Sequence, residues 1–255
     1  MHRIKVGMLL FSFLQAQVFY WEMTLLEFQR RVGDSIQIEI TSALNQSPTT
    51  PPDMEAVEVG TFRSGCAAGN RMKVYRFPVG EKKIRLEEGY HGDISWSWQP
   101  LAPLQLRGEK VWVFSLDSGA CSNYRDRTRA LVFYSKEYPG GVRMDYPNYS
   151  PSYFFFLEKL GLLFYFHLNE VGLLNLKNGE KIKAVRDWYD FLARQLEVVC
   201  EPGSGVRLAG EVKCFYAKDA SNVVLLKVSA SKADESCYYD RKKWPDRYIL
   251  VEWEL

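Results

Sequence analysis

The most reactive side chains in this sequence are cysteines and one histidine in a short polar run. His91 lies in the run YHGD at residues 90–93, where Asp93 is near enough in the chain to orient an imidazole. Cys121 or Cys66 would supply the thiol nucleophile of a Cys/His pair, the arrangement that a thiol hydrolase uses. A solvated turn explains the same residues without any chemistry. The two interpretations differ in how the thiols should react with alkylating probes.

No local pattern of a common enzyme site occurs in the chain. The sequence contains no GxGxxG, GxxxxGK[ST], HExxH or GxSxG pattern, which removes the nucleotide, zinc-protease and hydrolase sites that such patterns mark. His2, His91 and His167 are the only histidines, and none lies close to another. We therefore predict no metal site and no cofactor. A non-enzymatic protein is favoured over the thiol hydrolase.

Two tryptophans are the best candidates for a binding surface. Trp96 and Trp98 flank Ser97, and residues two apart in a strand lie on one face, so the indoles would form a flat stacking surface with Tyr90 nearby in the chain. Sugars and bases both stack on such surfaces. The net charge is only +2, which disfavours nucleic acid. A carbohydrate or protein ligand is predicted, and ordinary core packing of the indoles is the alternative.

The five cysteines allow disulfides but form no CxxC pattern. A zinc ribbon and a thioredoxin motif are therefore unsupported. Cys200 and Cys214 flank a predicted turn rich in Gly and Pro and form the first candidate pair. Cys66 and Cys121 both follow small residues and form the second, which leaves Cys237 over. In a reducing compartment all five would be free thiols.

The N-terminal residues bear on the localisation of the protein. The basic residues His2, Arg3 and Lys5 precede the apolar run at 6–14, which is the order of a secretory signal. Cleavage after Ala16 would remove Arg3 and Lys5 and leave a net charge near zero. The sequence thus predicts an exported protein, secreted, periplasmic or associated with the envelope.

Two further interpretations keep the segment in the mature chain. Apolar residues continue to Leu26, interrupted by Gln15, Gln17 and Glu22, and come close to the roughly 20 residues of a membrane anchor. The basic leader followed by an apolar helix resembles the N-terminus of type IV pilins and pseudopilins, which implies a subunit of a surface filament or phage-like assembly. Where that family has a glutamate, this sequence has Ser12. The other interpretation is a core helix to about residue 32 of a cytoplasmic protein.

Short strand-like runs separated by turn residues fill most of the chain. Residues 35–41 alternate isoleucine with polar neighbours, and Arg129–Ser135 is almost continuously apolar, which is typical of a central strand. The proline-rich stretch 42–53 is typical of an exposed loop. Further strands are predicted at 54–59, 71–77, 83–86, 110–116, 206–216, 222–228 and 248–255.

The segment near 153–200 is predicted to be helical. Residues 154–176 are strongly apolar, but charged residues interrupt them, so buried helices are favoured over a membrane span. Residues 181–199 carry apolar side chains at helical spacing, with Asn178 as the N-cap.

The predicted fold class is α+β, mainly antiparallel β-sheet with this helical segment and an N-terminal apolar helix or signal. Residues 33–255 would form a single domain after a signal peptide at 1–16 or a helix that extends to about residue 32. The leading hypothesis for function is an exported, non-enzymatic binding or structural protein. A thiol hydrolase and a filament subunit are the alternatives.

Overall fold

Most of the protein that the structure describes is β-sheet. The computed structural model describes residues 17–33, 49–61, 71–106, 108–120, 128–146, 152–157, 160–167, 170–184, 187–195, 199–200, 213–216, 222–228, 237–238 and 247–254. Strands account for 70% of these residues, and the same part of the chain contains two short helices. The predicted α+β class is therefore wrong, because the segment expected to be helical is mostly sheet.

Three antiparallel meanders follow one another along the chain, and each completes its sheet before the next begins. The first sheet contains β2 (Glu55–Thr61), β3 (Arg71–Val79) and β4 (Lys82–Glu87). The second sheet contains β5 (Gly89–His91), β6 (Ile94–Leu106), β7 (Glu109–Ala120), β8 (Thr128–Tyr134) and β9 (Val142–Tyr146). The third sheet contains β10 (Ser152–Leu157), β11 (Leu162–His167), β12 (Glu170–Asn175) and β13 (Lys181–Ala184).

The fourth sheet joins the two ends of the described chain. Its strand order is β1 (Gln17–Glu22), β18 (Arg247–Glu254), β16 (Val223–Val228) and β15 (Lys213–Tyr216). The register of β1 against β18 runs from Gln17 opposite Glu254 to Glu22 opposite Ile249. A separate two-stranded ribbon pairs β14 (Val199–Cys200) with β17 (Cys237–Tyr238).

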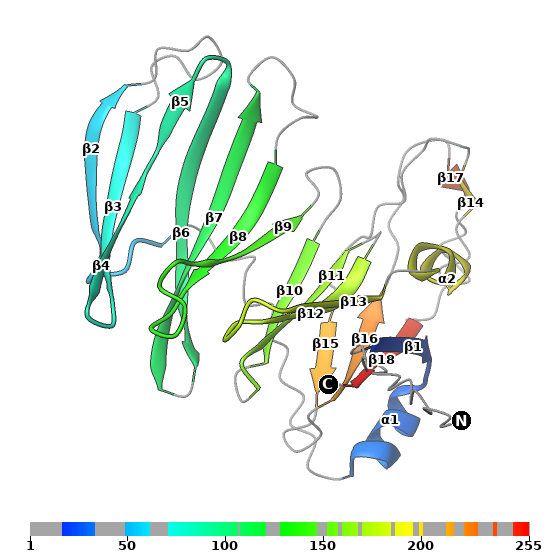
Figure 1. The fold of residues 1–255 in the computed structure, drawn as a ribbon. Coiled ribbons are helices and arrows are strands. Elements are labelled where there is room, and N and C mark those ends of the chain that lie inside the picture. Colours follow the sequence, from blue (N-terminus) through cyan, green and yellow to red (C-terminus); the bar gives the residue numbers. More distant parts are fainter. Residues whose placement is uncertain are drawn as a thin grey trace, which may run out of the picture.

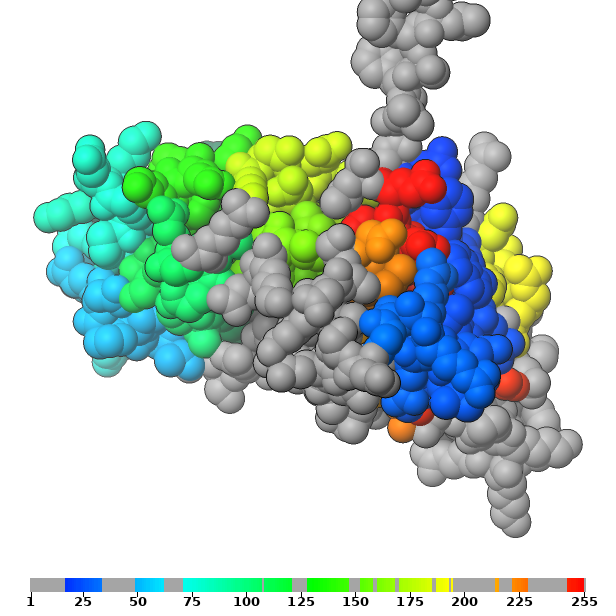
Figure 2. Space-filling view, turned by 90° about the horizontal axis from the view of Figure 1, so that it is seen from below, coloured from blue at the N-terminus to red at the C-terminus, as the bar shows by residue number. Residues whose placement is uncertain are grey.

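The four larger sheets stack as layers in chain order (Figure 1). We name the apolar clusters between successive sheets the first, second and third cores, and a fourth core joins the last sheet to α1 (Leu25–Val32). The helix α2 (Trp188–Gln195) contributes Trp188 and Leu192 to the third core. The space-filling view shows the same succession of layers, with α1 beside the strands of the last sheet (Figure 2).

The stacking explains why the central strands are apolar on both faces. In β7, Val111 and Val113 belong to the second core, whereas Trp112 and Phe114 belong to the first. In β11 all six residues are buried. Successive strand residues point to opposite faces, so a strand with a core on each side loses the alternation of apolar and polar residues.

That loss of alternation accounts for the main error of the helical prediction. Residues 154–176 contain most of β10 and all of β11 and β12 instead of buried helices. The predicted helix at 181–199 is also shorter, because Lys181–Ala184 is the edge strand β13 and only Trp188–Gln195 is helical. The side chain of Asn178 accepts a hydrogen bond of 3.0 Å from the backbone N–H of Glu180. Asn178 therefore supports the turn before β13 and caps no helix.

An apolar helix that runs through the N-terminal region is also contradicted. Residues 17–22 form the edge strand β1, as their aromatic and β-branched side chains favour. The helix α1 begins only after Thr24, whose hydroxyl accepts a hydrogen bond from the Glu27 backbone while the Glu27 carboxylate accepts one from the Thr24 backbone, a capping box. Residues 1–16 lie outside the described residues. No helix among the described residues has the length and apolar character needed to cross a membrane.

Most of the individual strand predictions are confirmed. The expected strands at 54–59, 71–77, 83–86, 110–116, 129–135, 222–228 and 248–255 correspond to β2, β3, β4, β7, β8, β16 and β18. As predicted, β8 is a central strand, because it pairs with β7 on one side and β9 on the other. The predicted strand at 35–41 and most of the predicted loop at 42–53 lie outside the described residues.

Candidate functional site

The predicted catalytic residues lie at one end of the second sheet. His91 is the last residue of β5, and Asp93 follows it in the tight turn before β6, with Gly92 at a φ of 59°. Both side chains are exposed. The register pairs Ala120, the last residue of β7, with Ile94, the first residue of β6. The chain therefore leaves β7 towards Cys121 directly beside the turn that carries His91 and Asp93.

The two predicted nucleophiles, Cys66 and Cys121, lie outside the described residues. Cys66 belongs to the connection between β2 and β3, and Cys121 to the connection between β7 and β8. The last residues of β2 and of β7 and the β5–β6 turn are at the same end of the first two sheets (Figure 1). Within the described ranges, no group of three or more His, Cys, Asp or Glu side chains is arranged to hold a metal ion.

The predicted binding residues Trp96 and Trp98 share one face of β6, as their spacing requires. Both are partly buried against the first core, and the Trp98 ring meets the Phe114 ring edge-on at 6.2 Å. Both indole N–H groups donate to the carbonyl oxygen of Glu87, at 2.8 Å from Trp96 and 3.1 Å from Trp98. The indoles are thus held by core packing on one side and by a shared hydrogen-bond acceptor on the other.

Tyr90 does not join the two indoles. It lies opposite Ser95 in the register, whereas Gly89 lies opposite Trp96. Alternation along the strands therefore places Tyr90 on the other face of the second sheet. Gly89 is the residue that touches the Trp96 ring, and an added Cβ at Gly89 would collide with that ring. A glycine here lets the indole lie directly on the backbone of β5.

A groove of about 550 Å³ opens between the first two sheets beside Trp98, and we call it the interlayer groove. Sheet one contributes its inner face at the end near Arg71, and sheet two contributes the middle of β6. The groove combines two aromatic rings with side chains of both charges and with neutral polar groups. Its lining residues include Glu58, Arg71, Lys73, Tyr75, Glu88 and Trp98.

Glu88 connects the two walls of the interlayer groove. Its carboxylate accepts a hydrogen bond from the backbone N–H of Lys73 at 2.9 Å and another from the backbone N–H of Trp98 at 3.1 Å. Both amides lie just beyond the ends of the neighbouring strands, since β4 pairs with β3 only as far as Val74 and β5 pairs with β6 only as far as Trp96. One side chain therefore replaces the missing strand partner on each sheet.

The electrostatics of the groove are set by burial and by these hydrogen bonds. Burial raises the pKa of Glu88, and the two backbone N–H donors and the Lys73 charge only partly oppose that effect. Burial also raises the pKa of Tyr75 to about 12, so its phenol stays protonated at neutral pH. Arg71 and Glu58 form an exposed ion pair at the rim. Exposed pairs of this kind contribute little to stability, which leaves both groups available to a ligand.

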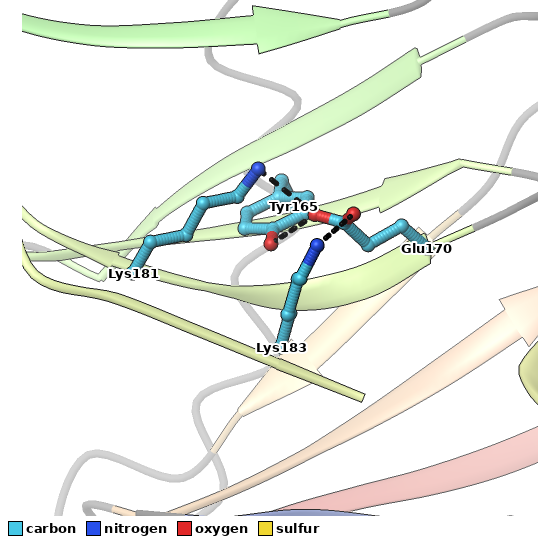
Figure 3. A network of polar contacts seen from close by, with 4 residues as sticks. All are labelled: Tyr165, Glu170, Lys181 and Lys183. Atoms are coloured by element: carbon cyan, nitrogen blue, oxygen red, sulfur yellow. Dashed lines mark hydrogen bonds and ion pairs between the residues drawn. The ribbon is translucent and has the colours of Figure 1, made fainter. Parts of the chain in front are cut away.

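A second polar cluster lies on the third sheet, where the second core ends (Figure 3). The Tyr165 hydroxyl donates to the Glu170 carboxylate at 2.5 Å, and the ammonium groups of Lys181 and Lys183 lie 2.9 Å and 3.4 Å from the same carboxylate. The Lys181 ammonium also lies 5.0 Å from the centre of the Tyr165 ring. We call these four residues the Glu170 cluster.

The Glu170 cluster keeps its carboxylate charged. Burial alone would raise the pKa of Glu170, but the hydrogen bonds from Tyr165 and Lys181 and the charges of both lysines outweigh it, so the pKa lies below its ordinary value. Burial, followed by the hydrogen bond to Glu170, raises the pKa of Tyr165. The neighbouring His167 is buried, and burial lowers its pKa. The cluster therefore holds a protonated tyrosine against an ionised glutamate, an arrangement that stabilises the sheet.

The sequence alone did not indicate that Glu88 connects the two sheets or that Glu170 is the centre of a polar cluster. Glu88 stands between two short strands with no motif around it, so only the strand register reveals its function. Glu170 and His167 were visible as polar residues within an apolar run, and that interruption was the signal that could have located the cluster. The carbonyl oxygen of His167 accepts a hydrogen bond of 3.0 Å from the Trp188 indole N–H, which attaches α2 to the third sheet.

The structure does not support the predicted pair Cys200–Cys214. Cys214 is a free thiol, buried in the third core. Burial raises its pKa, which disfavours the reactive thiolate. Cys200 instead stands opposite Cys237 in the ribbon of β14 and β17. The predicted pair Cys66–Cys121 lies outside the described residues.

The chain was compared with protein-family models, curated proteins and solved structures, and no match was found in any of the three. Function is therefore inferred from the chemistry of the interlayer groove and of the adjoining β5–β6 turn.

Proposed function

We propose that this protein is an exported, non-enzymatic binding protein that holds a carbohydrate in the interlayer groove. The observation that carries the proposal is the interlayer groove itself, which has a volume of about 550 Å³. In it the partly buried Trp98 indole lies beside positively and negatively charged side chains that can form hydrogen bonds. A sugar ring presents an apolar face and an edge of hydroxyls, so it needs an aromatic surface with donors and acceptors around it. Trp98 supplies the surface, and Arg71, Lys73 and Glu88 supply the polar groups.

The groove is built to keep its shape without a ligand. Trp98 is held through its ring contact with Phe114 and through its indole N–H, and Glu88 fixes both walls through backbone hydrogen bonds. A binding site that is already ordered loses less conformational entropy when the ligand enters. This rigidity favours a binding role over one that needs a moving lid.

The geometry of β1 supports export by a cleaved signal. Among the described residues, the pairing of β1 with β18 runs from Gln17 to Glu22, so cleavage after Ala16 would leave all of these pairs in the mature chain. The anchor and filament alternatives were argued from a helix that continues beyond Ala16. The strand at 17–22 interrupts that helix, and the apolar run at 6–14 has the length of a signal peptide core.

The test is binding of the full chain to a panel of immobilised oligosaccharides, neutral and uronic-acid containing, followed by titration with intrinsic tryptophan fluorescence. Lys73→Ala and Arg71→Ala remove exposed side chains of β3 that line the groove outside the apolar cores, so both variants should fold. We expect each to weaken binding about tenfold, the loss of one hydrogen bond to a charged or polar group.

The matched control is Arg85→Ala on β4. Arg85 is exposed and pairs with Glu87, away from the residues that line the groove. The affinity of the Arg85→Ala variant for the oligosaccharide should equal that of the wild type. Absence of binding to every oligosaccharide in the panel would overturn the proposal, and so would binding that neither groove variant weakens.

The β7 register favours a second candidate function, the thiol hydrolase. Ala120 pairs with Ile94, which brings the end of β7 beside the turn of His91 and Asp93. If Cys121 is activated by His91, iodoacetamide should label it rapidly near neutral pH, and His91→Ala should slow that labelling to the rate of an ordinary thiol. Labelling of Cys121 at equal rates in the two proteins would exclude this function.

A further inference from the structure

The ribbon of β14 and β17 places two cysteines face to face in the strand register. Cys200 and Cys237 are direct Cα partners in this antiparallel pair, and Val199 and Tyr238 are the neighbouring partners. Directly opposite residues of an antiparallel pair have their α-carbons about 4.5–5.5 Å apart. A disulfide spans roughly 4.4–6.8 Å between α-carbons. The register therefore meets the backbone requirement for a disulfide.

The ribbon is too short for its hydrogen bonds alone to hold it. It consists of two strands of two residues each and belongs to none of the four larger sheets. An isolated two-stranded ribbon is marginally stable in water even when it is longer. A covalent link between its strands would supply the missing stability.

Cys214, which lies between Cys200 and Cys237 in the sequence, does not compete for either of them. Cys214 lies on β15 within the fourth sheet, is fully enclosed by the third core, and is a free thiol. Its burial keeps it protonated and out of reach of a disulfide reagent. A disulfide between Cys200 and Cys214, which their spacing in the sequence suggested, is thereby disfavoured.

We propose that Cys200 and Cys237 form a disulfide that fastens β14 to β17. The bond encloses residues 201–236, which contain β15 and β16, so it ties together both ends of the segment that supplies half of the fourth sheet. Two thiols lose two electrons and two protons, and the S–S bond forms. The oxidant is a disulfide of the exporting compartment or glutathione disulfide, which is reduced to two thiols.

The proposal rests on the proposed export only for the supply of this oxidant in the cell. In vitro, glutathione disulfide replaces the compartment, so the pairing is tested independently. The full chain is incubated in a glutathione redox buffer, free thiols are blocked with iodoacetamide, and the protein is digested and mapped by mass spectrometry without reduction. We expect a peptide pair that joins Cys200 to Cys237, with Cys214 alkylated only after unfolding. A bond from Cys200 to Cys214, or alkylation of both Cys200 and Cys237, would overturn the pairing.

Stability provides a second readout. The variant Cys66→Ser/Cys121→Ser removes the other candidate pair, so any remaining effect of reductant belongs to the ribbon. In this background, dithiothreitol should lower Tm by about 10 °C, because opening a loop of this length restores unfolded-chain entropy. Adding Cys237→Ser should produce the same low Tm and abolish the effect of dithiothreitol, while adding Cys214→Ser should leave that effect intact. An equal Tm with and without reductant would refute the disulfide, and a bond found in vitro but absent from protein isolated from its host would refute export alone.

Discussion

Replacing Glu170 by glutamine should remove a charge on which three neighbours depend. In the folded protein the carboxylate accepts a hydrogen bond from Tyr165 and faces the ammonium groups of Lys181 and Lys183. Glutamine has nearly the same shape, so its side-chain oxygen can still accept from the Tyr165 hydroxyl. The substitution therefore removes charge while the packing of the third sheet stays intact.

The expected loss of stability follows from the contacts. A hydrogen bond to a charged group is worth about 1.5–3 kcal/mol and a neutral one about 0.5–1.5 kcal/mol, so the Tyr165 contact weakens by about 1 kcal/mol. The side chains of Lys181 and Lys183 are 36% and 45% exposed. Solvent therefore screens both ion pairs, and together they add about 1 kcal/mol. We expect Glu170→Gln to destabilise the protein by about 2 kcal/mol at pH 7.

The dependence on pH separates this mechanism from a packing defect. The folded-state pKa of Glu170 is depressed, so its stabilisation is present above the unfolded pKa of about 4.3 and is lost as the pH falls through the folded value. The deficit of Glu170→Gln relative to the wild type should therefore shrink in acid. Urea unfolding followed by the fluorescence of the buried Trp188 and Trp253 at pH 7 and at lower pH measures it.

Glu137→Gln provides the matched control for this prediction. Glu137 is an exposed glutamate in the turn after β8, and its substitution should change the free energy of unfolding by less than about 0.5 kcal/mol. A deficit of Glu170→Gln that is equally small at pH 7, or one that persists unchanged in acid, would refute the reasoning.

Three further predictions concern the packing of the layers. Gly172→Ala should destabilise the protein by about 3 kcal/mol in urea unfolding, because the new Cβ would collide with the Ile182 carbonyl oxygen and the Tyr165 hydroxyl; stability equal to the wild type would contradict this close approach. Phe28→Ala should cost about 3–5 kcal/mol, since the ring is fully buried in the fourth core, and limited proteolysis should then cut within α1. Glu88→Gln should cost about 1–3 kcal/mol, because its amide N–H₂ meets one of two backbone donors; unchanged urea unfolding would show that this carboxylate does not connect the sheets.

The strands that could be predicted from the sequence are those whose environment differs between their two faces or whose ends carry clear turn residues. The strand β3 is an example, with buried Tyr75, Phe77 and Val79 alternating with exposed Arg76 and Pro78. In contrast, β6 was recognised only around its tryptophans. It contains prolines at 100 and 103, which normally argue against a strand interior. Pro100 lies beyond the end of β5, and Pro103 falls within the register shift between Leu101 and Leu104, so neither position requires a backbone donor.

The error at 154–176 has a different cause. Every residue of Tyr153–Leu157 and Leu162–His167 is buried, so neither a period of two nor a period of 3.6 is visible in the hydrophobic pattern. A continuous apolar run is compatible with a buried helix or a buried strand. The aromatic richness of the run favours strands, and the glycine at 161, with a φ of 67°, lies in the turn directly before β11. The context that decides between the two structures is the presence of a sheet on each side, which local sequence does not contain.

The positions of the predicted site residues depend partly on spacing within a strand and partly on strand register. Trp96 and Trp98 do share a face, because spacing by two in a strand is sufficient for that. Tyr90 lies on the other face of the sheet, because the hairpin register puts it opposite Ser95. Cys214 was predicted as the disulfide partner of Cys200 because the two are close in sequence. The strand register of the ribbon instead places Cys200 opposite Cys237, 37 positions away.

The layered architecture also restricts where this protein can bind anything. The second and third sheets have an apolar core on each face, so their central residues are unavailable to a ligand. Two groups of polar side chains stand out at the margins of the described layers, the interlayer groove and the Glu170 cluster. The Glu170 cluster uses its charges on one another, whereas the groove presents the Lys73 side chain to solvent beside aromatic rings. Among these two margins, the interlayer groove is therefore the one whose chemistry is directed outward, and variants of its exposed residues are the ones expected to change binding while leaving the layers intact.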